Sequence, residues 1–171
     1  MMTFRLVETS FGVFALVVHG DRLVGTFLPD QQRVVLTQIR ERFPDAVETQ
    51  RGLPQFCRQV SAYFNGKAVK FNAKLDLSGM PPFRQAVLNA CLRVPFGKTA
   101  SYGDLARAAG SPGAARAVGG AMAHNPLPLI IPCHRILRSD GSIGGFSSPR
   151  GIKVKQRLLR LEGIVSWEKA A

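Results

Sequence analysis

The sequence predicts a small α/β domain over residues 1–78, followed by a mainly helical domain over residues 79–171 that contains a helix-turn-helix. Two observations predict this order. The first 30 residues alternate short apolar and polar stretches, whereas apolar residues recur at helical spacing in the second half. A third observation places the boundary, because a glycine and two prolines interrupt regular structure at residues 79–82.

Three strands and two helices are predicted in the first half. Apolar runs predict strands over residues 4–7, 12–18 and 23–28, with a hairpin turn at Gly20-Asp21. Two helical stripes follow, each ending at a turn signal: Val35, Ile39 and Phe43 before Pro44, and Phe56, Val60 and Phe64 before Asn65-Gly66. We find no chemistry-bearing pattern in this half.

Composition and charge limit the class of protein. The three cysteines cannot all pair with one another, and no apolar N-terminal stretch resembles a signal peptide or a membrane span, so we expect a cytoplasmic protein. The formal charge is +12, and residues 81–171 carry 13 Lys and Arg against 4 Asp and Glu. Such a basic half commonly binds nucleic acid, although it also occurs as a solvated surface or faces acidic lipid.

Residues 83–123 predict a core helix followed by the helix-turn-helix. Apolar spacing predicts a helix over residues 83–94 that places Cys91 in a core. Ser101 is a natural N-cap for the next helix. Gly110-Ser111-Pro112 then supplies a helix stop, a cap and a proline for the first turn of the second helix of the motif.

The second helix of this motif has an almost bare face, formed at helical spacing by Arg116, Gly119, Gly120 and Ala123. Each interior glycine costs about 1 kcal/mol relative to alanine, so something should require the small residues. Close packing against another helix is one explanation, and close approach to a nucleic-acid backbone is the other. A base-reading helix carries polar side chains on this face, so the bare face suits sequence-independent binding in a narrow groove, with Arg116 as a wedge.

The motif Ile131-Pro132-Cys133-His134-Arg135 places a thiol beside an imidazole. We expect residues 129–131 to form a short buried strand, because the prolines before them prevent the helix from continuing. A thiol attacks as thiolate, and a neighbouring imidazole takes its proton or stabilises the resulting charge. Cys133 is therefore a candidate nucleophile and His134 its candidate base, unless Cys133 is only a small core residue.

Three further side chains are candidates for supporting this pair. Asn125 lies where the helix ends and either bonds the freed backbone groups or is an ordinary turn residue. Glu162 lies at the edge of the buried face of the last helix, which ends at Gly163, and either orients His134 or is a tolerated helix-end residue. Arg135 is expected to bind phosphate or to form a salt bridge between the halves.

Together these residues resemble the O6-alkylguanine-DNA alkyltransferases, also called methylated-DNA–protein-cysteine methyltransferases. The resemblance extends from about residue 83 to residue 163. Its motifs, in order, are Val94-Pro95-Phe96-Gly97, Ser101-Tyr102-Gly103, Ala115-Arg116-Ala117-Val118-Gly119-Gly120-Ala121-Met122, Asn125-Pro126, Pro132-Cys133-His134-Arg135 and Leu161-Glu162-Gly163. The first half is compatible with the family's variable ribonuclease-H-like domain, and the helix-turn-helix is expected to be winged-helix-like.

The resemblance implies a DNA repair protein that is consumed in one turnover and needs no cofactor. Cys133 is expected to accept the alkyl group from O6 of a damaged guanine, and also from O4 of thymine, as a thioether. By the same resemblance His134 deprotonates Cys133 through a water, Glu162 stands behind His134, and Asn125 braces the hinge. Tyr102 is expected to contact the flipped guanine and to help protonate it as it leaves.

The resemblance also implies minor-groove binding to double-stranded DNA by a monomer, without sequence preference. Arg116 is expected to occupy the space that the flipped base leaves in the stack. The other residues expected at the DNA are Ser101, Tyr102, Ala115, Ala117, Gly119, Gly120 and Arg135. The protein is then expected in the cytoplasm near the nucleoid, or in the nucleus of a eukaryote.

Two departures from the family pattern concern the alkyl pocket and zinc. The loop over residues 144–151 is about two residues longer than in well-known members, with Phe146 where many have tyrosine. The resemblance places Phe146, Pro128 and Ser147 in the pocket, with Ser147 as a backbone donor to O6. The zinc ligands of some members' first domains have no counterparts here, so we expect no metal.

Three other classes remain as alternatives. A lesion-sensing relative without transfer activity lacks the cysteine that Cys133 retains. A helix-turn-helix regulator requires tight preference for one duplex sequence, which the bare helix face disfavours. A cysteine hydrolase requires an oxyanion motif that we do not identify in the sequence.

Overall fold

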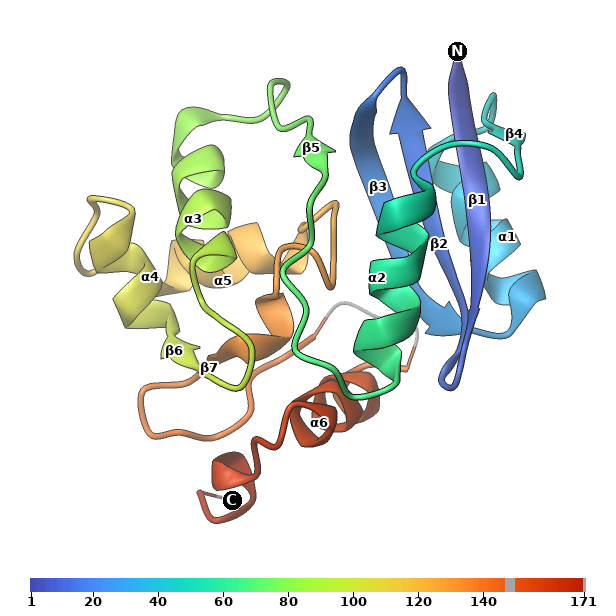
Figure 1. Ribbon diagram of the computed structural model, residues 1–171. Helices are drawn as coiled ribbons and strands as arrows, with labels where there is room; N and C mark the ends of the chain where they lie inside the picture. The colour runs from blue at the N-terminus through green and yellow to red at the C-terminus, as the bar shows by residue number, and fades with distance from the viewer. Residues whose placement is uncertain (147–149, 171) are drawn as a thin grey trace. The chain divides into compact units, whose positions relative to one another are not determined.

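The computed structural model describes residues 1–146 and 150–170 (Figure 1). The chain divides into two units, Met1–Leu77 and Ser78–Ala171, and each unit forms its own internal contacts. The first unit is a five-stranded mixed sheet in the order β4-β1-β2-β3-β5. Its centre is antiparallel and consists of β1 (Met2–Thr9), β2 (Gly12–His19) and β3 (Arg22–Asp30). The three predicted strands and the hairpin between His19 and Arg22 are confirmed.

Short parallel strands and two helices complete the first unit. The edge strands are β4 (Val47–Glu48), beside β1, and β5 (Lys74–Leu75), beside β3. Helices α1 (Gln32–Arg42) and α2 (Pro54–Phe64) cover opposite faces of the sheet (Figure 1). Both helices are confirmed, because apolar residues spaced three or four apart form one stripe that the sheet buries.

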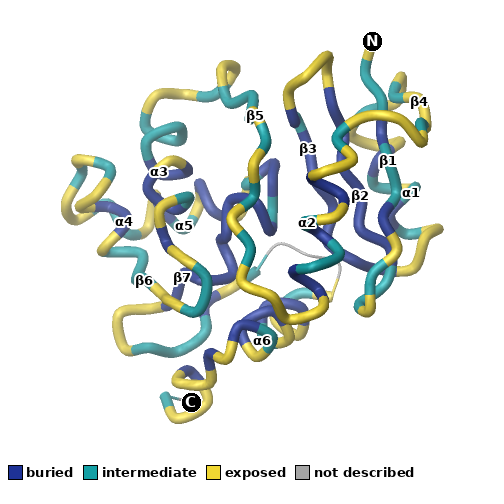
Figure 2. Tube along the Cα trace, in the orientation of Figure 1, coloured by how far each residue is buried: buried dark blue, intermediate teal, exposed yellow. Residues whose placement is uncertain are grey.

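Strand alternation distributes the core of this unit over both faces of the sheet. On one face, Ala15 and Val17 of β2 pack with Val35 and Ile39 of α1 in a single apolar cluster. On the other face the Phe14 ring lies 6.3 Å from that of Phe64 in α2. The middle strand β2 is therefore buried over residues 13–18, as Figure 2 shows.

The second unit consists of helices with one very small sheet. Its helices are α3 (Pro82–Leu92), α4 (Tyr102–Ala108), α5 (Ala115–Ala123) and α6 (Ile152–Leu161). Strands β6 (Ala100–Ser101) and β7 (Ile136–Leu137) pair in parallel. A mixed sheet with helices thus precedes a helical unit, which confirms the predicted fold class.

Helices α4 and α5 form the predicted helix-turn-helix. The Ser101 hydroxyl accepts a bond of 3.0 Å from the Asp104 backbone N–H, and the Asp104 carboxylate accepts one of 2.8 Å from the Ser101 backbone N–H. This reciprocal capping satisfies backbone donors that the start of a helix leaves open. The prediction for Pro112 is wrong, because Gly113 has a φ of +87° and delays α5 until Ala115.

The predicted strand over residues 129–131 is also wrong. Leu129 adopts a φ of +78°, a left-handed conformation that no strand contains. The segment turns instead, and the Ile131 N–H donates to the Leu127 carbonyl at 2.9 Å. The turn leads directly into a short 3-10 helix, Cys133–Arg135. The thiol therefore follows a tight turn, although the segment is buried as expected.

The chain after α6 folds back onto this unit. Trp167 is buried with Leu137, Leu159 and Ile164, and its indole N–H donates to the Ile164 carbonyl at 3.1 Å. Within residues 1–146 and 150–170, no helix has the length and apolar character needed to cross a bilayer.

Candidate active site and DNA-binding surface

Cys133 lies at the start of the 3-10 helix and is only 5% exposed. The side-chain amide of Asn125 donates to its sulfur at 3.1 Å and to the Ile131 carbonyl at 2.9 Å. The Asn125 carbonyl oxygen in turn accepts a bond of 3.0 Å from the Leu127 backbone N–H. One amide therefore fixes both ends of the turn and the thiol, which is the hinge position that the sequence predicts for Asn125.

The thiol of Cys133 holds its proton in the resting protein. Burial raises the pKa of Cys133 above its ordinary value of 9.0, while the Asn125 hydrogen bond and the positive charge of Lys155 lower it in part. Because burial has the larger effect, little thiolate exists at neutral pH. Nucleophilic attack by this sulfur thus requires a base.

The neighbouring imidazole is bound to a buried carboxylate. His134 Nε2 lies 2.6 Å from Glu162 Oε1, and both side chains are fully buried. The second oxygen of Glu162 accepts bonds from the Gly97 backbone N–H at 3.0 Å and from Arg135 Nε at 2.9 Å. Glu162 therefore joins the end of α6 to the 3-10 helix and to the loop after α3.

This network sets the protonation of its members. Burial raises the pKa of Glu162, but hydrogen bonds and charge from His134 and Arg135 outweigh it and lower the value to about 2. Burial lowers the pKa of His134 below 6.5 against the opposing effect of Glu162. Neutral His134 then donates its Nε2 hydrogen to the carboxylate, which leaves Nδ1 as the proton acceptor of the ring.

The prediction that Arg135 contacts DNA is wrong. Its side chain is 8% exposed, and its guanidinium donates to both oxygens of Glu162 and, at 2.7 Å, to the Val94 carbonyl. The alternative, a salt bridge between the halves, is wrong as well, because Glu162 belongs to the same unit. Arg135 supplies the positive charge that lets a buried carboxylate remain ionised.

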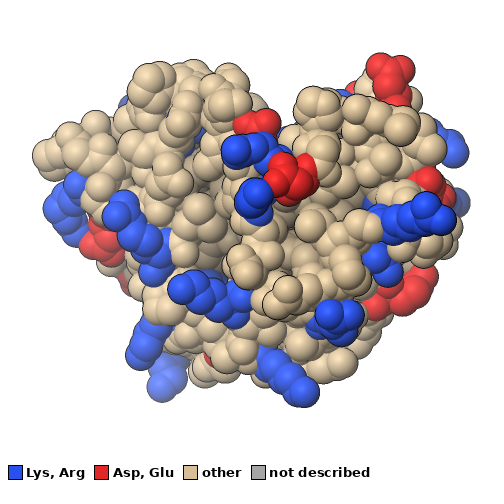
Figure 3. Space-filling view, turned by 45° about the horizontal axis from the view of Figure 1, so that its top comes forward, with Lys and Arg blue, Asp and Glu red and all other residues tan. Residues whose placement is uncertain are grey.

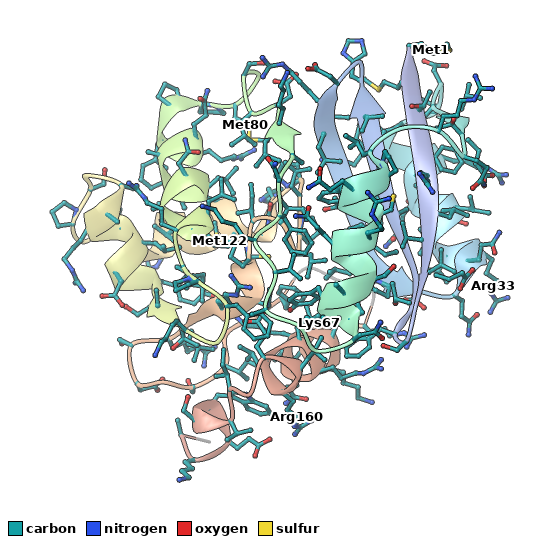
Figure 4. The ribbon with its side chains drawn as sticks, in the orientation of Figure 1. Met1, Arg33, Lys67, Met80, Met122 and Arg160 are labelled. Carbon is teal, nitrogen blue, oxygen red and sulfur yellow. The ribbon has the colours of Figure 1, made fainter. Side chains whose placement is uncertain are left out.

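A pocket of about 380 Å³ opens above the thiol. It is lined by Tyr102, Gly119, Met122, Ala123, Cys133, Gly145 and Phe146. The apolar wall that α5 contributes includes Met122, labelled in Figure 4. The structure differs from the sequence prediction at Pro128, which is not part of this lining and instead forms an isolated bridge with Ile131. Ser147 lies outside the described residues.

Tyr102 stands over Gly144 in this pocket. A methyl group at the Gly144 Cα would lie 2.6 Å from the Tyr102 hydroxyl oxygen, so only glycine leaves the phenol in place. Burial raises the pKa of Tyr102, chiefly by disfavouring the phenolate. The phenol is consequently protonated at neutral pH and can donate a hydrogen bond into the pocket.

The sequence gives no sign that Lys155 is buried beside the pocket. Its side chain is fully buried in α6, its ammonium donates to the Ile136 carbonyl at 2.6 Å, and it lies about 6 Å from the ring centres of both Tyr102 and Phe146. Burial lowers its pKa from 10.5 to about 8. This charge thus contacts two walls of the pocket and also favours the Cys133 thiolate.

The face of α5 that carries Arg116 and Gly120 is exposed. A methyl group added at Gly119 or Gly120 would meet no atom within 4 Å. Close packing within the described protein therefore does not explain these two glycines. The explanation that remains from the sequence is contact with a partner that approaches the helix backbone closely.

Comparisons with known proteins connect this geometry to a family. The profile described as "6-O-methylguanine DNA methyltransferase, DNA binding domain" matches residues 82–164. The methylated-DNA–protein-cysteine methyltransferase of Mycobacterium tuberculosis is 37% identical over 166 residues, which cover 95% of this chain and 93% of the relative. This chain belongs to the methylated-DNA–protein-cysteine methyltransferase family. The Methanosarcina barkeri member is 41% identical over 94% of this chain and 97% of its own length.

Solved structures of the family share the fold along nearly the whole chain. The crystal structure of the Mycobacterium tuberculosis O6-methylguanine methyltransferase is 36% identical and superposes with a TM-score of 0.78, covering 95% of this chain and 93% of that one. A crystal structure of the same bacterium's protein in complex with DNA is 36% identical, with a TM-score of 0.80 over 94% of this chain and 92% of that chain.

The structure brings most of the predicted site residues of this family member together. Cys133, Tyr102 and Phe146 line one pocket, Asn125 holds the thiol, and His134 lies on Glu162. Ser101 caps α4, and Ala115, Arg116 and Ala117 lie in the first turn of α5. Among the described residues, no three His, Cys, Asp or Glu side chains form a group that could hold a metal.

Gly120→Ala separates the two explanations for the bare face of α5. Gly120 does not line the pocket, and an added methyl group meets open space. We expect this variant to be more stable in urea by about 0.5–1 kcal/mol, because alanine favours a helix, and to bind duplex DNA more weakly. Stabilisation with unchanged duplex affinity would remove the nucleic-acid explanation.

Lys155→Met removes the buried charge and keeps most of the side-chain volume. We expect reaction with free O6-benzylguanine at pH 7.5 to slow about tenfold, as for a rise of about one unit in the thiol pKa. Stability should increase, since the folded-state pKa of Lys155 lies below 10.5 and its charged form opposes folding below about pH 8. Intact-protein mass against time and urea unfolding measure the two effects. A loss of both rate and stability would reduce Lys155 to a packing residue.

Proposed function

We propose that this chain flips an O6-alkylated guanine out of duplex DNA and transfers the alkyl group irreversibly to the Cys133 sulfur, once per protein molecule. The observation that carries the proposal is that one pocket is lined both by the Cys133 thiol and by Gly119 and Ala123 of the exposed α5 face. A helix with a bare surface can lie against DNA while the pocket beside it receives a single extruded base. O4-alkylthymine is the expected second substrate.

Proton transfer accompanies the substitution. The Cys133 proton passes through a water to neutral His134, whose Nε2–H remains hydrogen-bonded to the Glu162 carboxylate. A sulfur–carbon bond forms as the bond between the alkyl carbon and O6 breaks, and the bonding electron pair goes to the guanine. The guanine takes up one proton, with the protonated Tyr102 phenol as its donor in the pocket. The Tyr102 phenolate then takes up a proton from water and His134 releases one to water, because both groups rest in their neutral forms. The net change moves the alkyl group to sulfur and one proton from the thiol to the guanine, and no cofactor takes part.

DNA binding in this proposal is a minor-groove contact without sequence preference, made by a monomer. The support is the composition of the exposed α5 face, where Arg116 is the only long side chain beside Ala117, Gly120 and Ala123. Residues 81–171 also carry 13 Lys and Arg against 4 Asp and Glu, which favours contact with phosphates, and Figure 3 shows Lys and Arg side chains at the surface. Arg116 fills the gap that the extruded base leaves. The buried free thiols Cys57, Cys91 and Cys133 support a reducing, cytoplasmic location.

Intact-protein mass tests the proposed function directly. After incubation with a duplex that contains one O6-methylguanine, we expect the mass to increase by one methyl group and to saturate at one per protein. Cys133→Ala should bind the same duplex and gain no mass, because Asn125 and the backbone still hold the turn. Duplex binding without a mass change in the wild type would favour a sensor or a regulator, and repeated turnover without DNA would favour a hydrolase.

The pH dependence of transfer tests His134 as the base. Glu162 stays ionised well below neutrality because its pKa is lowered to about 2, and His134 stays neutral at pH 7 because burial lowers its pKa. The rate of reaction with free O6-benzylguanine should therefore fall in acid, as His134 gains a proton. It should also decline, by less than about tenfold, as the pH rises through 8 and Lys155 loses the charge that favours the thiolate. A tenfold increase per pH unit up to pH 9 would mean that hydroxide, not His134, deprotonates Cys133.

A further inference from the structure

Arg138 lies at the end of the small sheet of the second unit and has no role in the reaction described above. It directly follows β7, whose Leu137 pairs with Ser101 in the parallel register of β6 and β7. The next step of that register places Arg138 beside Tyr102, the first residue of α4. The backbone of Arg138 is fixed on both sides, because its N–H donates to the Ser142 carbonyl at 3.0 Å and its carbonyl accepts from the Gly141 N–H at 2.9 Å.

The Arg138 guanidinium is exposed and has no acidic partner among the described residues. The nearest acidic residue along the chain is Asp140. Its carboxylate instead accepts bonds from the Ser142 backbone N–H at 2.9 Å and from the Ser142 hydroxyl at 2.6 Å. A fixed backbone thus presents a positive charge that the surrounding protein does not neutralise.

This charge reaches the pocket electrostatically. Burial raises the pKa of Tyr102 and the charge of Arg138 opposes that rise. Burial lowers the pKa of Lys155, with a smaller contribution in the same direction from Arg138. The guanidinium therefore lies within electrostatic range of a pocket wall, Tyr102, and of the ammonium that contacts it.

A nucleotide that leaves the stack carries its own phosphates with it. When its base enters the pocket beside Tyr102, the sugar and the flanking phosphates must pass the rim. Arginine binds a phosphate in a bidentate manner and stays charged at every relevant pH. A phosphate contact orients the DNA and carries no sequence information, which agrees with the bare face of α5.

We propose that Arg138 binds a phosphate next to the flipped nucleotide and so holds the extruded base in the pocket beside Tyr102. This role rests on the proposed function and adds a positioning residue from outside the helix-turn-helix. Arg116 then stabilises the gap in the stack, and Arg138 stabilises the backbone of the nucleotide that left it. The ligand is the phosphodiester of double-stranded DNA.

Arg138→Gln tests this role through salt dependence and lesion preference. We expect it to weaken binding to a duplex with one O6-methylguanine about tenfold, as for the loss of one charge-assisted bond. The slope of log affinity against log salt should become shallower by about 0.9, the value for one phosphate contact. Affinity for the undamaged duplex should change less, because the phosphate reaches Arg138 only after flipping. Arg138→Lys should restore the salt slope.

Two controls distinguish the possible outcomes. Arg160→Gln removes an exposed arginine of α6 that is bonded to Glu168 at 2.9 Å, and it should leave the slope unchanged (Figure 4). Reaction of Arg138→Gln with free O6-benzylguanine, which has no phosphate, should stay within about twofold of the wild type. Equal losses on the free base and the duplex, or an unchanged salt slope, would overturn the role of Arg138. A wild type that gains no methyl group would instead overturn the proposed function.

Discussion

The buried carboxylate of Glu162 is the constraint on which the second unit depends. It accepts hydrogen bonds from His134, from Arg135 and from the Gly97 backbone, so the 3-10 helix and the loop after α3 meet the end of α6 at two oxygen atoms. Removing one member of such a buried ion pair costs about 3–5 kcal/mol, because the remaining charge has no compensation. The position of the 3-10 helix, and therefore of the thiol, is consequently tied to the end of α6. Glu162 thus orients His134 and also connects the end of α6 to the 3-10 helix and to the loop after α3.

The two buried charges of α6 are stabilised very differently. Glu162 has a guanidinium and an imidazole beside it, whereas Lys155 has, within residues 1–146 and 150–170, a carbonyl and two aromatic rings. Both pKa values are lowered, but the effect on charge is opposite, since the partners of Glu162 favour its charged form and burial of Lys155 disfavours its charged form. A protein selected only for stability would replace such a lysine with an apolar residue. The buried Lys155 ammonium therefore lowers the stability of the folded protein. Its positive charge favours the Cys133 thiolate and lies close to the Tyr102 and Phe146 rings of the pocket.

Local signals in the sequence predict the three long strands and the α-helices, whereas contacts between distant residues are not predictable from them. Capping residues and apolar spacing predict α4 and α5, because Ser101 and Gly110 act on their own helix termini. The strand predicted over residues 129–131 fails since an apolar run does not reveal the left-handed backbone of Leu129. The sequence does not reveal that Arg135 binds Glu162, because Glu162 lies 27 residues further along the chain, so a DNA phosphate is the expected partner instead. Lys155 was missed for a related reason: a lysine in a basic helix is ordinarily solvated, and only the packed structure buries it.

In the proposed function, binding without sequence preference leaves the discrimination of damage to the pocket. A bare helix face makes the same contacts along any duplex, so it cannot favour a damaged site over the many undamaged ones. Extrusion costs a few kcal/mol and costs less where alkylation has weakened pairing, so the first discrimination precedes any contact with the thiol. The second follows inside a pocket of about 380 Å³, where only an alkyl carbon beside the Cys133 sulfur can react. A normal guanine that enters the pocket offers no alkyl carbon for the Cys133 sulfur to attack, so it returns to the duplex unchanged. Burial raises the thiol pKa, which limits reaction of the resting sulfur with other electrophiles and so preserves the single use of the protein.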